Sequence, residues 1–341
     1  MSSYVFNGYI VTPIGPCSFG AEVSGINWKQ SPLPDSCIEA LVLLQNKYGV
    51  IVFRETGLDN ERQVRFASQL GELEMNPAWG GTKRVGTPYL FDVSNIEDDG
   101  SVVKKGSRRW AHSLGNALWH TDSSFNQHRS KYSLLLAHRV PGETQTVTEF
   151  ADTRQAWKDV PEEQKVELRS LIVEHNLWHS RRLASPDIYQ KPTEEEQRLK
   201  PGSYHRLVQK APNGGETLFI AAHAKTLFTG EGKEVPESQK LIWKLIDHCT
   251  QPQYTFSCEW LSAGDMIWWD NRQSMHRASP YSEAMGPRDV RRATVYDDGD
   301  NAFGVKVPQS VQGCAPLSVI VPSTEEGALS VIASTSTILK G

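Results

Sequence analysis

Hydrophobic and polar residues follow two patterns along this chain, and the strand pattern is the more frequent one. Apolar residues occupy every second position from Tyr254 to Trp260, which is the period of a strand with one buried face. Segment 50–53 (VIVF) is apolar throughout, which fits a strand buried on both faces. Further strands are expected within 4–30 and over 132–138, 218–220, 266–270 and 290–296.

Apolar residues at helical spacing, placed after capping signals, predict several helices. The first is expected to have Asp35 or Ser36 as its N-cap and to end at Gly49. Gln45 is expected on the side of this helix that faces water. Further helices are expected over 59–70, closed by Gly71, and from Asp152, from Pro161 and from Val235-Pro236-Glu237 with Pro236 at N1.

Strands outnumber helices, and the helices cluster in the N-terminal third and in two later insertions. This order predicts a mainly β protein with α-helices (α+β), built as a jelly-roll barrel with helices packed outside it. We expect a single domain over residues 1–300 and a C-terminal extension over 301–341, whose end is rich in Ser and Thr and fits a frayed tail. Residues 181–203 are polar and broken by proline, which is typical of a surface excursion.

Glycine and proline interrupt the pattern between Asn76 and Arg109. Asp98-Asp99-Gly100 is a hairpin-turn signal between 91–93 and 102–103. The basic run 104–109 (KKGSRR) fits a solvated loop. The alternative is a mobile lid, over about 80–110, that would exclude water from a nearby site. The sequence leaves both interpretations open.

Composition and charge exclude several function classes. A hydrophobic content of 38%, a charged content of 22% and a net charge of -4 give no reason to expect nucleic acid or an anionic membrane as a partner. No apolar run approaches the ~20 residues that span a bilayer. The first residues lack a signal-peptide pattern, and the cysteines are scattered with no Cys-x-x-Cys pair. These features favour a cytoplasmic protein.

Candidate chemistry centres on segment 118–125 (LWHTDSSF), which places His120 and Asp122 two residues apart. On an extended strand both side chains project from one face. A histidine and a carboxylate are two ligands of the facial triad that binds non-haem Fe(II). The spacing alone equally fits a half-buried strand histidine beside a polar acceptor.

The rest of such a site would come from later in the chain. His276 follows the apolar strand 266–270 and, alone, reads equally as a surface-turn histidine. Arg288 and Arg292 are four residues apart, so that strand alternation points both to one face and Arg291 to the other. They fit a solvated charge run or an inward pair that grips a carboxylate ligand.

Taken together, these residues resemble the Fe(II)/2-oxoglutarate dioxygenases of the taurine dioxygenase and 2,4-dichlorophenoxyacetate dioxygenase (TauD/TfdA) family, over roughly residues 8–297. The herbicide-dioxygenase branch is the more similar one. The matching segments are 20–25 (GAEVSG), 49–54 (GVIVFR), 70–73 (LGEL), 118–125 (LWHTDSSF), 148–152 (TEFAD), 179–182 (HSRR) and 269–292, which begins WDNR.

The resemblance implies a role for each matching position. His120, Asp122 and His276 match the iron ligands. Arg288 matches the arginine that pairs with the distal carboxylate of 2-oxoglutarate, and Thr148 matches the threonine that assists it. The implied fold is the double-stranded β-helix, or jelly roll, of clavaminate-synthase-like enzymes. Fe(II), the cosubstrate 2-oxoglutarate and O2 are the implied cofactors.

Substrate residues follow less directly from the resemblance. Arg292 matches an arginine that holds the substrate anion in relatives with anionic substrates. Asn76 stands where taurine-using relatives have histidine, which argues against taurine. His223 falls where the herbicide branch has histidine, and it fits a structural strand histidine equally well. Trp119, next to His120, is a candidate substrate contact and fits a wall or core residue as well.

The activity implied is oxidation of a small organic substrate, expected to be an anion, by hydroxylation, desaturation or cyclisation, with release of succinate and CO2. Two other classes stay open on the residues alone: a metal-binding jelly-roll sensor without oxygenase activity, and a zinc hydrolase that uses the same ligands. A buried Arg288 would favour the oxygenase, because a metal sensor needs no cation there. The primary substrate is not fixed by the sequence, nor is the oligomeric state, a homo-oligomer included.

Overall fold

A computed structural model describes residues 2–75, 83–142, 146–279 and 286–306. Asn76 and most of the expected C-terminal extension, residues 307–341, lie outside the described residues. Among the described residues, no helix is both long and apolar enough to cross a membrane.

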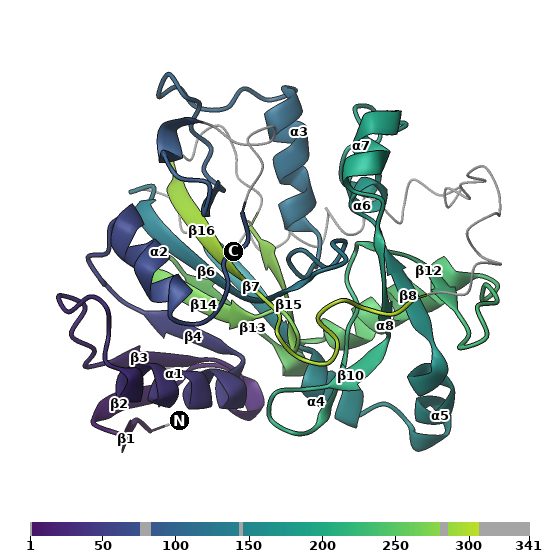
Figure 1. Cartoon of the computed structure of the whole chain (residues 1–341), viewed down its shortest axis with the longest axis horizontal. Coiled ribbons are helices and arrows are strands. Elements are labelled where there is room, and N and C mark those ends of the chain that lie inside the picture. Colours follow the sequence, from purple (N-terminus) through teal and green to yellow (C-terminus); the bar gives the residue numbers. More distant parts are fainter. Residues whose placement is uncertain (1, 76–82, 143–145, 280–285, 307–341) are drawn as a thin grey trace, which may run out of the picture. The chain divides into compact units, whose positions relative to one another are not determined.

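The largest element is an eight-stranded sheet in the order β1-β2-β3-β4-β14-β6-β16-β5 (Figure 1). Only β3 and β4 pair in parallel, and the other neighbours are antiparallel. Its strands are β1 (Tyr4–Phe6), β2 (Tyr9–Pro13), β3 (Ala21–Ser24), β4 (Val50–Phe53), β5 (Leu90–Asp92), β6 (Ser130–Arg139), β14 (Met266–Asp270) and β16 (Asp289–Tyr296).

A smaller antiparallel sheet, in the order β13-β7-β15, faces the large one. Its strands are β7 (Val147–Asp152), β13 (Thr255–Glu259) and β15 (Ser274–Ala278). A core cluster fills the space between the sheets, to which β14 contributes Ile267 and Trp269 and the small sheet contributes Phe150. The two facing sheets confirm the predicted jelly roll.

The apolar runs predicted from the sequence lie in the middle of the large sheet, where both faces are covered. In β14, Ile267 and Trp269 face the small sheet, while Met266 and Trp268 face a second core under helices α1 (Asp35–Tyr48) and α2 (Asn60–Ser68). β4 is divided between the same two cores. β4 and β14 are apolar along almost their whole length because none of their positions is exposed to water.

Four helix predictions need correction. Pro34, not Asp35 or Ser36, is the N-cap of α1, and no side chain caps it. Gln45 is fully buried rather than facing water, because its Nε2 donates to the Gly49 carbonyl at the end of the helix.

The other corrections concern the ends of α8 and α2. α8 begins at Ser238, after an N-cap at Glu237, so Pro236 precedes the helix. Asp59 caps α2 as its position suggests, but the C-cap is Gln69 and not Gly71.

A helical segment with small sheets follows β7 and has its own apolar core. Its helices are α4 (Thr153–Lys158), α5 (Glu162–Ser170), α6 (Leu177–Ala184), α7 (Glu194–Leu199) and α8 (Ser238–Cys249). Its strands are β8 (Ile172–His175), β9 (Ser203–Arg206), β10 (Val208–Lys210), β11 (Glu216–Leu218) and β12 (Ala224–Phe228).

The expected surface excursion over 181–203 was wrong for part of its length. Arg181 is buried at the end of α6, and Tyr189 is buried in a cluster with Trp178 and with Ala111 of helix α3 (Arg108–Leu114). The prediction failed because polarity was taken as exposure, whereas an arginine can line a polar cavity and a tyrosine can pack into an apolar cluster.

The segment between residues 83 and 110 is tied to the large sheet by ion pairs. Arg84 pairs with Asp92 of β5 and with Asp289 of β16, and Arg109 pairs with Asp92 and Glu97. The predicted hairpin turn is present, because Glu97 accepts from Gly100 and donates to the carbonyl of Ser101. Residues 80–82 of the expected lid lie outside the described residues.

Candidate active site

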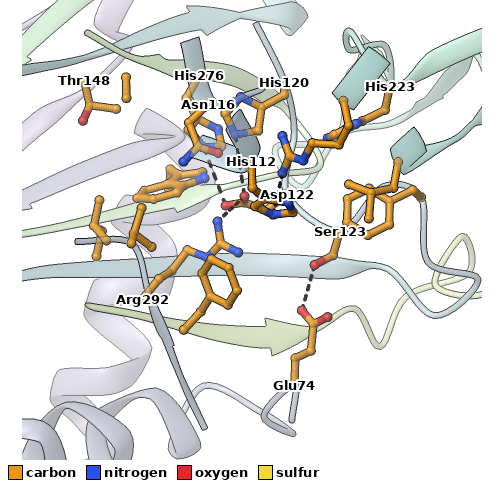
Figure 2. Close-up of a pocket in the computed structure, with 18 of the residues that line it drawn as sticks. Glu74, His112, Asn116, His120, Asp122, Ser123, Thr148, His223, His276 and Arg292 are labelled. Atoms are coloured by element: carbon orange, nitrogen blue, oxygen red, sulfur yellow. Dashed lines mark hydrogen bonds and ion pairs between the residues drawn. The ribbon is translucent and has the colours of Figure 1, made fainter. Parts of the chain in front are cut away.

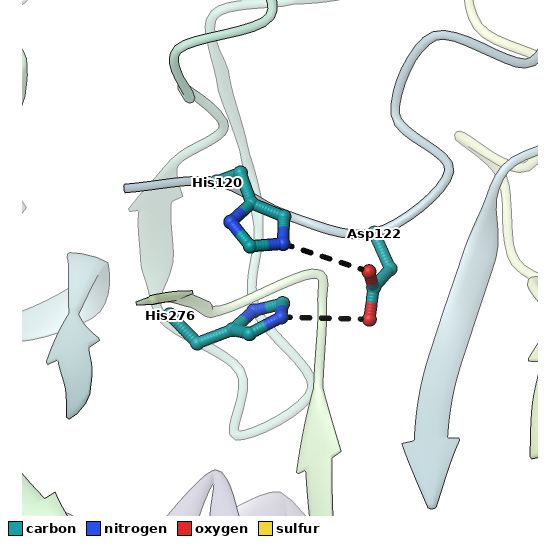
Figure 3. A group of neighbouring side chains, drawn as sticks. All are labelled: His120, Asp122 and His276. Carbon is teal, nitrogen blue, oxygen red and sulfur yellow. Dashed lines mark ion pairs between the residues drawn. The ribbon is translucent and has the colours of Figure 1, made fainter. Parts of the chain in front are cut away.

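Three side chains from distant parts of the chain meet at one end of the sandwich. His120, Asp122 and His276 are buried, and one ligand atom from each lies within 4.8 Å of the others. The Nε2 atom of His120 is 3.8 Å from Asp122 Oδ1, and that of His276 is 3.6 Å from Oδ2 (Figure 3). The structure therefore brings together the three residues that the sequence motif proposed.

The backbone around this cluster differs from the expected strand. His120 forms an isolated antiparallel bridge with His276, through backbone hydrogen bonds of 2.9 and 2.8 Å. This bridge adds one residue to the edge of the small sheet at β15. Asp122 then enters a turn, in which Ser123 has a φ of 56°. The side chains converge because the bridge aligns the two histidines, and not because residues 120–122 form a regular strand.

Asn271 holds the turn in place, and the sequence analysis did not single it out. Its Oδ1 accepts from the Asp122 backbone N–H (3.0 Å) and from the Trp269 indole (3.1 Å). Its Nδ2 donates to Ser133 Oγ (2.9 Å), which in turn donates to Asp122 Oδ2 (2.8 Å). The signal was its place in the matching segment WDNR, directly after strand β14.

The chemistry of the three side chains fits a divalent metal ion. The Leu118 carbonyl accepts from His120 Nδ1 at 2.7 Å, so the hydrogen is on Nδ1 and the lone pair of Nε2 faces Asp122. Burial lowers the pKa of His120, and burial together with His120 lowers the pKa of His276 well below its usual range. Both imidazoles are therefore neutral and can act as ligands.

The Asp122 carboxyl is ionised despite its burial. Burial raises its pKa, but the charge of Arg292, helped by the hydrogen bond from Ser133, outweighs that effect, and the pKa is lowered to about 2. Arg292 Nη1 donates to Asp122 Oδ1, as Figure 2 shows. Two neutral imidazoles and one carboxylate, with the remaining side open to a cavity, are the donor set of the 2-His-1-carboxylate Fe(II) site.

One end of the adjoining cavity contains Thr148 and Arg288, both buried. The Trp260 indole donates to Thr148 Oγ1 at 3.0 Å, which leaves the hydroxyl hydrogen available to another acceptor. The guanidinium of Arg288 lies 5.7 Å from the centre of the Trp260 ring. Trp260 thus positions both residues, and the sequence analysis had used it only as part of a strand pattern.

The opposite end of the cavity contains His223 and several polar residues, and Figure 2 shows Thr148 and His223 on opposite sides of the three-residue cluster. His223 Nδ1 lies 2.7 Å from Ser180 Oγ, whose hydrogen is donated to the Leu177 carbonyl. His223 Nδ1 is therefore the donor, and Nε2 is left as an acceptor. His112 and Arg181 line the cavity too, although neither was proposed from the sequence.

Trp119 does not line the cavity, in contrast to its proposed role. Its ring packs against the core of the helical segment and lies 4.7 Å from the Arg277 guanidinium. The alternation that places His120 inward turns Trp119 away from the site. Asn76 lies outside the described residues, and its proposed role is untested.

Comparison with known proteins identifies the family. Residues 10–294 match the model described as "Taurine catabolism dioxygenase TauD, TfdA family". The chain is 36% identical to the alpha-ketoglutarate-dependent 2,4-dichlorophenoxyacetate dioxygenase of Burkholderia sp. (strain RASC), over 72% of this chain and 80% of that protein. It is 32% identical to the enzyme of the same name from Cupriavidus pinatubonensis, over 85% of this chain and 98% of that one.

Solved structures agree with this result. A crystal structure of AAD-2 in complex with Mn(II) and N-oxalylglycine superposes with a TM-score of 0.74 at 35% identity, covering 84% of this chain and 96% of that one. The fold, the motifs and the His-Asp-His geometry lead to the same conclusion: the chain belongs to the TauD/TfdA family of alpha-ketoglutarate-dependent dioxygenases.

Proposed function

We propose that this dioxygenase oxidises an aryloxyalkanoate or a closely related aromatic carboxylate, with His120, Asp122 and His276 as its Fe(II) ligands. Fe(II) and 2-oxoglutarate, when bound, supply the oxidation of a substrate C–H bond by O2 with release of succinate and CO2. The relatives named after 2,4-dichlorophenoxyacetate and phenoxypropionate support the substrate class.

The observation that carries the proposal is the charge of the cavity. Among its described lining residues, four are cationic (Arg181, Lys200, Arg288 and Arg292) and two are anionic (Glu74 and Asp122), which gives 4 − 2 = +2. Fe(II) and the 2-oxoglutarate dianion together add no net charge. The remaining positive charge therefore favours an anionic substrate.

The walls of the cavity favour an aromatic body on that anion. Phe91 and Phe125 line it together with Leu135 and Leu177. Phe125 packs edge-on against His223, with the ring centres 4.9 Å apart, and the Arg292 guanidinium lies 5.2 Å from the centre of the Phe91 ring. A ring with one carboxylate matches this mixture of apolar wall and buried cations.

At the other end of the cavity, Arg288 and Thr148 are the proposed partners of the distal carboxylate of 2-oxoglutarate. A guanidinium can grip that carboxylate with two parallel hydrogen bonds, and the free hydrogen of the Thr148 hydroxyl supplies one more. The large sheet and the small sheet enclose both residues, so the carboxylate would be kept away from water.

The test is succinate release by the purified protein with Fe(II), 2-oxoglutarate and a panel of carboxylates, sulfonates and sulfates. Phenoxyacetate and 2-phenoxypropionate are expected to stimulate release most. Hydroxylation at the carbon beside the ether oxygen gives a hemiacetal or hemiketal whose C–O bond breaks to release phenol with glyoxylate from phenoxyacetate or pyruvate from 2-phenoxypropionate, so phenol should form in step with succinate. Stimulation by taurine or alkyl sulfates instead, with no phenol from the ethers, would rule out the substrate class.

The ligand assignment is tested separately from the substrate. Anaerobic Fe(II) with 2-oxoglutarate should give a weak visible charge-transfer band in the wild-type protein. His120→Ala and Asp122→Ala should each remove this band and abolish succinate release, while His138→Ala, a histidine that does not line the cavity, should keep both. Turnover that persists in the first two variants would remove these residues from the metal site.

A further inference from the structure

Arg181 is a buried cation that the family motifs did not assign to any task. It lies near the end of α6, and only 7% of its surface is exposed. Like His112 and His223, it lines the cavity. Its Nη2 donates to His112 Nε2 at 3.3 Å, and its Nε has no hydrogen-bond partner. Within the described part of the chain, no Asp or Glu forms an ion pair with it.

Gly115 fixes the position of this guanidinium. A Cβ atom on Gly115 would lie 1.5 Å from Arg181 Nη1 and 2.7 Å from Cζ, so the guanidinium rests directly on the bare Cα. Gly115 has ordinary helical backbone angles (φ -60°, ψ -23°) as the C-cap of α3, so its backbone does not require glycine. The close approach of Arg181 is what a side chain at this position would prevent.

The buried Arg181 guanidinium is charged and would be stabilised by a bound anion. Burial lowers the pKa of Arg181 to about 10, with Arg292 acting in the same direction, so the group stays charged at neutral pH. A buried charge without a counter-ion is costly, and a ligand carboxylate would satisfy both the charge and the free N–H groups. Arg292, the residue that the motif proposed for this task, already donates to Asp122.

Building on the proposed function, we infer that Arg181, and not Arg292, binds the carboxylate of the substrate. Arg181 follows Ser180, the partner of His223, on the same helix, and Figure 2 shows His223 on the side of the cluster opposite Thr148, so substrate and 2-oxoglutarate would approach the metal ligands from different sides. Phe125 and Leu177 lie on the same side as Arg181 and contact the aromatic body. Arg292 then serves as a positioning residue for the Asp122 carboxylate.

The test compares phenoxyacetate with its neutral analogue phenoxyacetamide in the Fe(II)- and 2-oxoglutarate-loaded enzyme. Arg181→Gln is expected to lower kcat/KM for the acid on the order of 100-fold, mostly through KM, because a charge-assisted pair is lost. The value for the amide should change little, so the preference for the acid should disappear. A structural role alone would lower both values together.

Gly115→Ala provides a second variant that leaves the arginine in the chain. The new methyl group must displace the guanidinium, and the loss of acid preference should follow in the same direction. Arg182→Gln is the matched control, since it removes one positive charge from the same helix outside the cavity and should behave as the wild type. Folding of each variant is checked by its unfolding midpoint in urea.

Equilibrium dialysis of phenoxyacetate against the metal-free protein gives a readout that does not depend on turnover. Binding should weaken in Arg181→Gln and in Gly115→Ala. The inference is overturned if both folded variants keep the acid preference, or if Arg292→Gln alone removes it. Failure of the proposed function is a different result, in which wild-type protein releases no succinate with any aryloxyalkanoate.

Discussion

Asp122 shows how single residues control this site. Its carboxylate is buried, and Ser133, Arg292, His120 and His276 all face it. Such a group stays ionised only while its partners are in place, because the low-dielectric interior favours the neutral acid. The residues that hold the carboxylate are therefore expected to matter as much for the proposed metal binding as the carboxylate itself.

Asn271→Ala tests this dependence. The change removes the acceptor of the Asp122 backbone N–H and of the Trp269 indole, and leaves both donors buried. We expect the free energy of unfolding to fall by about 2–3 kcal/mol. The affinity for Mn(II), used as a stable substitute for Fe(II), should fall roughly 10- to 100-fold. Urea unfolding and Mn(II) electron paramagnetic resonance measure the two effects, and unchanged metal affinity in a folded variant would contradict the positioning role.

Arg288→Ala tests the proposed cosubstrate end. The KM for 2-oxoglutarate should rise on the order of 30- to 100-fold, since one charge-assisted carboxylate pair is lost. The Mn(II) affinity should change much less, because Arg288 is not a ligand. Arg291→Gln is the control, as its side chain points away from the cavity toward Asp289 and Asn60. Equal effects of Arg288→Ala on metal and cosubstrate would count against the assignment.

At the scale of whole elements, the sequence analysis predicted most accurately the strands that are buried on both faces, because burial on both faces requires apolar residues at nearly every position. β4 and β14 were expected as apolar runs, and both lie in the middle of the large sheet. The inward direction of Arg288 and Arg292 also followed from strand alternation, since both line the cavity. These predictions depend only on local geometry.

The failures share a different cause. The positions of Gln45 and Arg181 depend on specific partners: the Gly49 carbonyl at the end of the same helix for Gln45, and the glycine at the end of α3 for Arg181. The sequence alone does not distinguish a polar side chain that lines a buried cavity from one that is exposed to water. The turn at Asp122 was missed for a similar reason, because the strand-like pairing of His120 comes from His276, more than a hundred residues away.

Substitutions of two neighbouring tryptophans in β14 test whether the two faces of this strand have separate roles. Trp268 points into the core under α1 and α2, whereas the Trp269 ring lies 4.6 Å from that of His276. Each change to Ala should lower the free energy of unfolding by about 3–5 kcal/mol. Only Trp269→Ala should also weaken Mn(II) binding, because it removes the packing of the proposed ligand His276 and a hydrogen bond to Asn271. Loss of metal affinity in Trp268→Ala, measured on folded protein at low temperature, would argue against this separation.

Across the whole molecule, one buried arginine, which is ion-paired beside the large sheet, also contacts the helical segment. Arg129, just before β6, donates from Nε to Asp297 Oδ2 at 2.9 Å and from Nη1 to Gln209 of β10. Its guanidinium lies 4.5 Å from the centre of the Phe219 ring. Since the metal-site residues come from the sheets and Arg181 comes from the helical segment, the contacts of Arg129 with Gln209 and Phe219 help to hold the two parts that line the cavity together.

The same pair should make stability depend on pH. Burial raises the pKa of the Asp297 carboxyl, but Arg129 and Arg272 outweigh it, so the folded-state pKa lies below the unfolded value of about 3.9. A carboxyl with a lowered pKa stabilises the fold above the unfolded pKa, and this contribution is lost as the pH falls through the folded pKa. Urea unfolding should therefore give a nearly constant free energy from pH 7 to 5 and a decline below about pH 4.

Asp297→Asn should remove part of that decline. The substitution leaves Arg129 buried without its counter-ion, so at pH 7 the free energy of unfolding should fall by about 3–5 kcal/mol. Below pH 4 the difference in free energy of unfolding from the wild type should narrow, because the wild-type carboxylate is then being protonated.

Asp298→Asn is the matched control. The Asp298 carboxylate lies 2.6 Å from Lys131 Nζ, but its side chain is 72% exposed. Its loss should therefore lower the free energy of unfolding by less than about 1 kcal/mol. A gap between Asp297→Asn and wild type that stays equally wide at pH 3 and pH 7 would show that the pair contributes packing rather than charge.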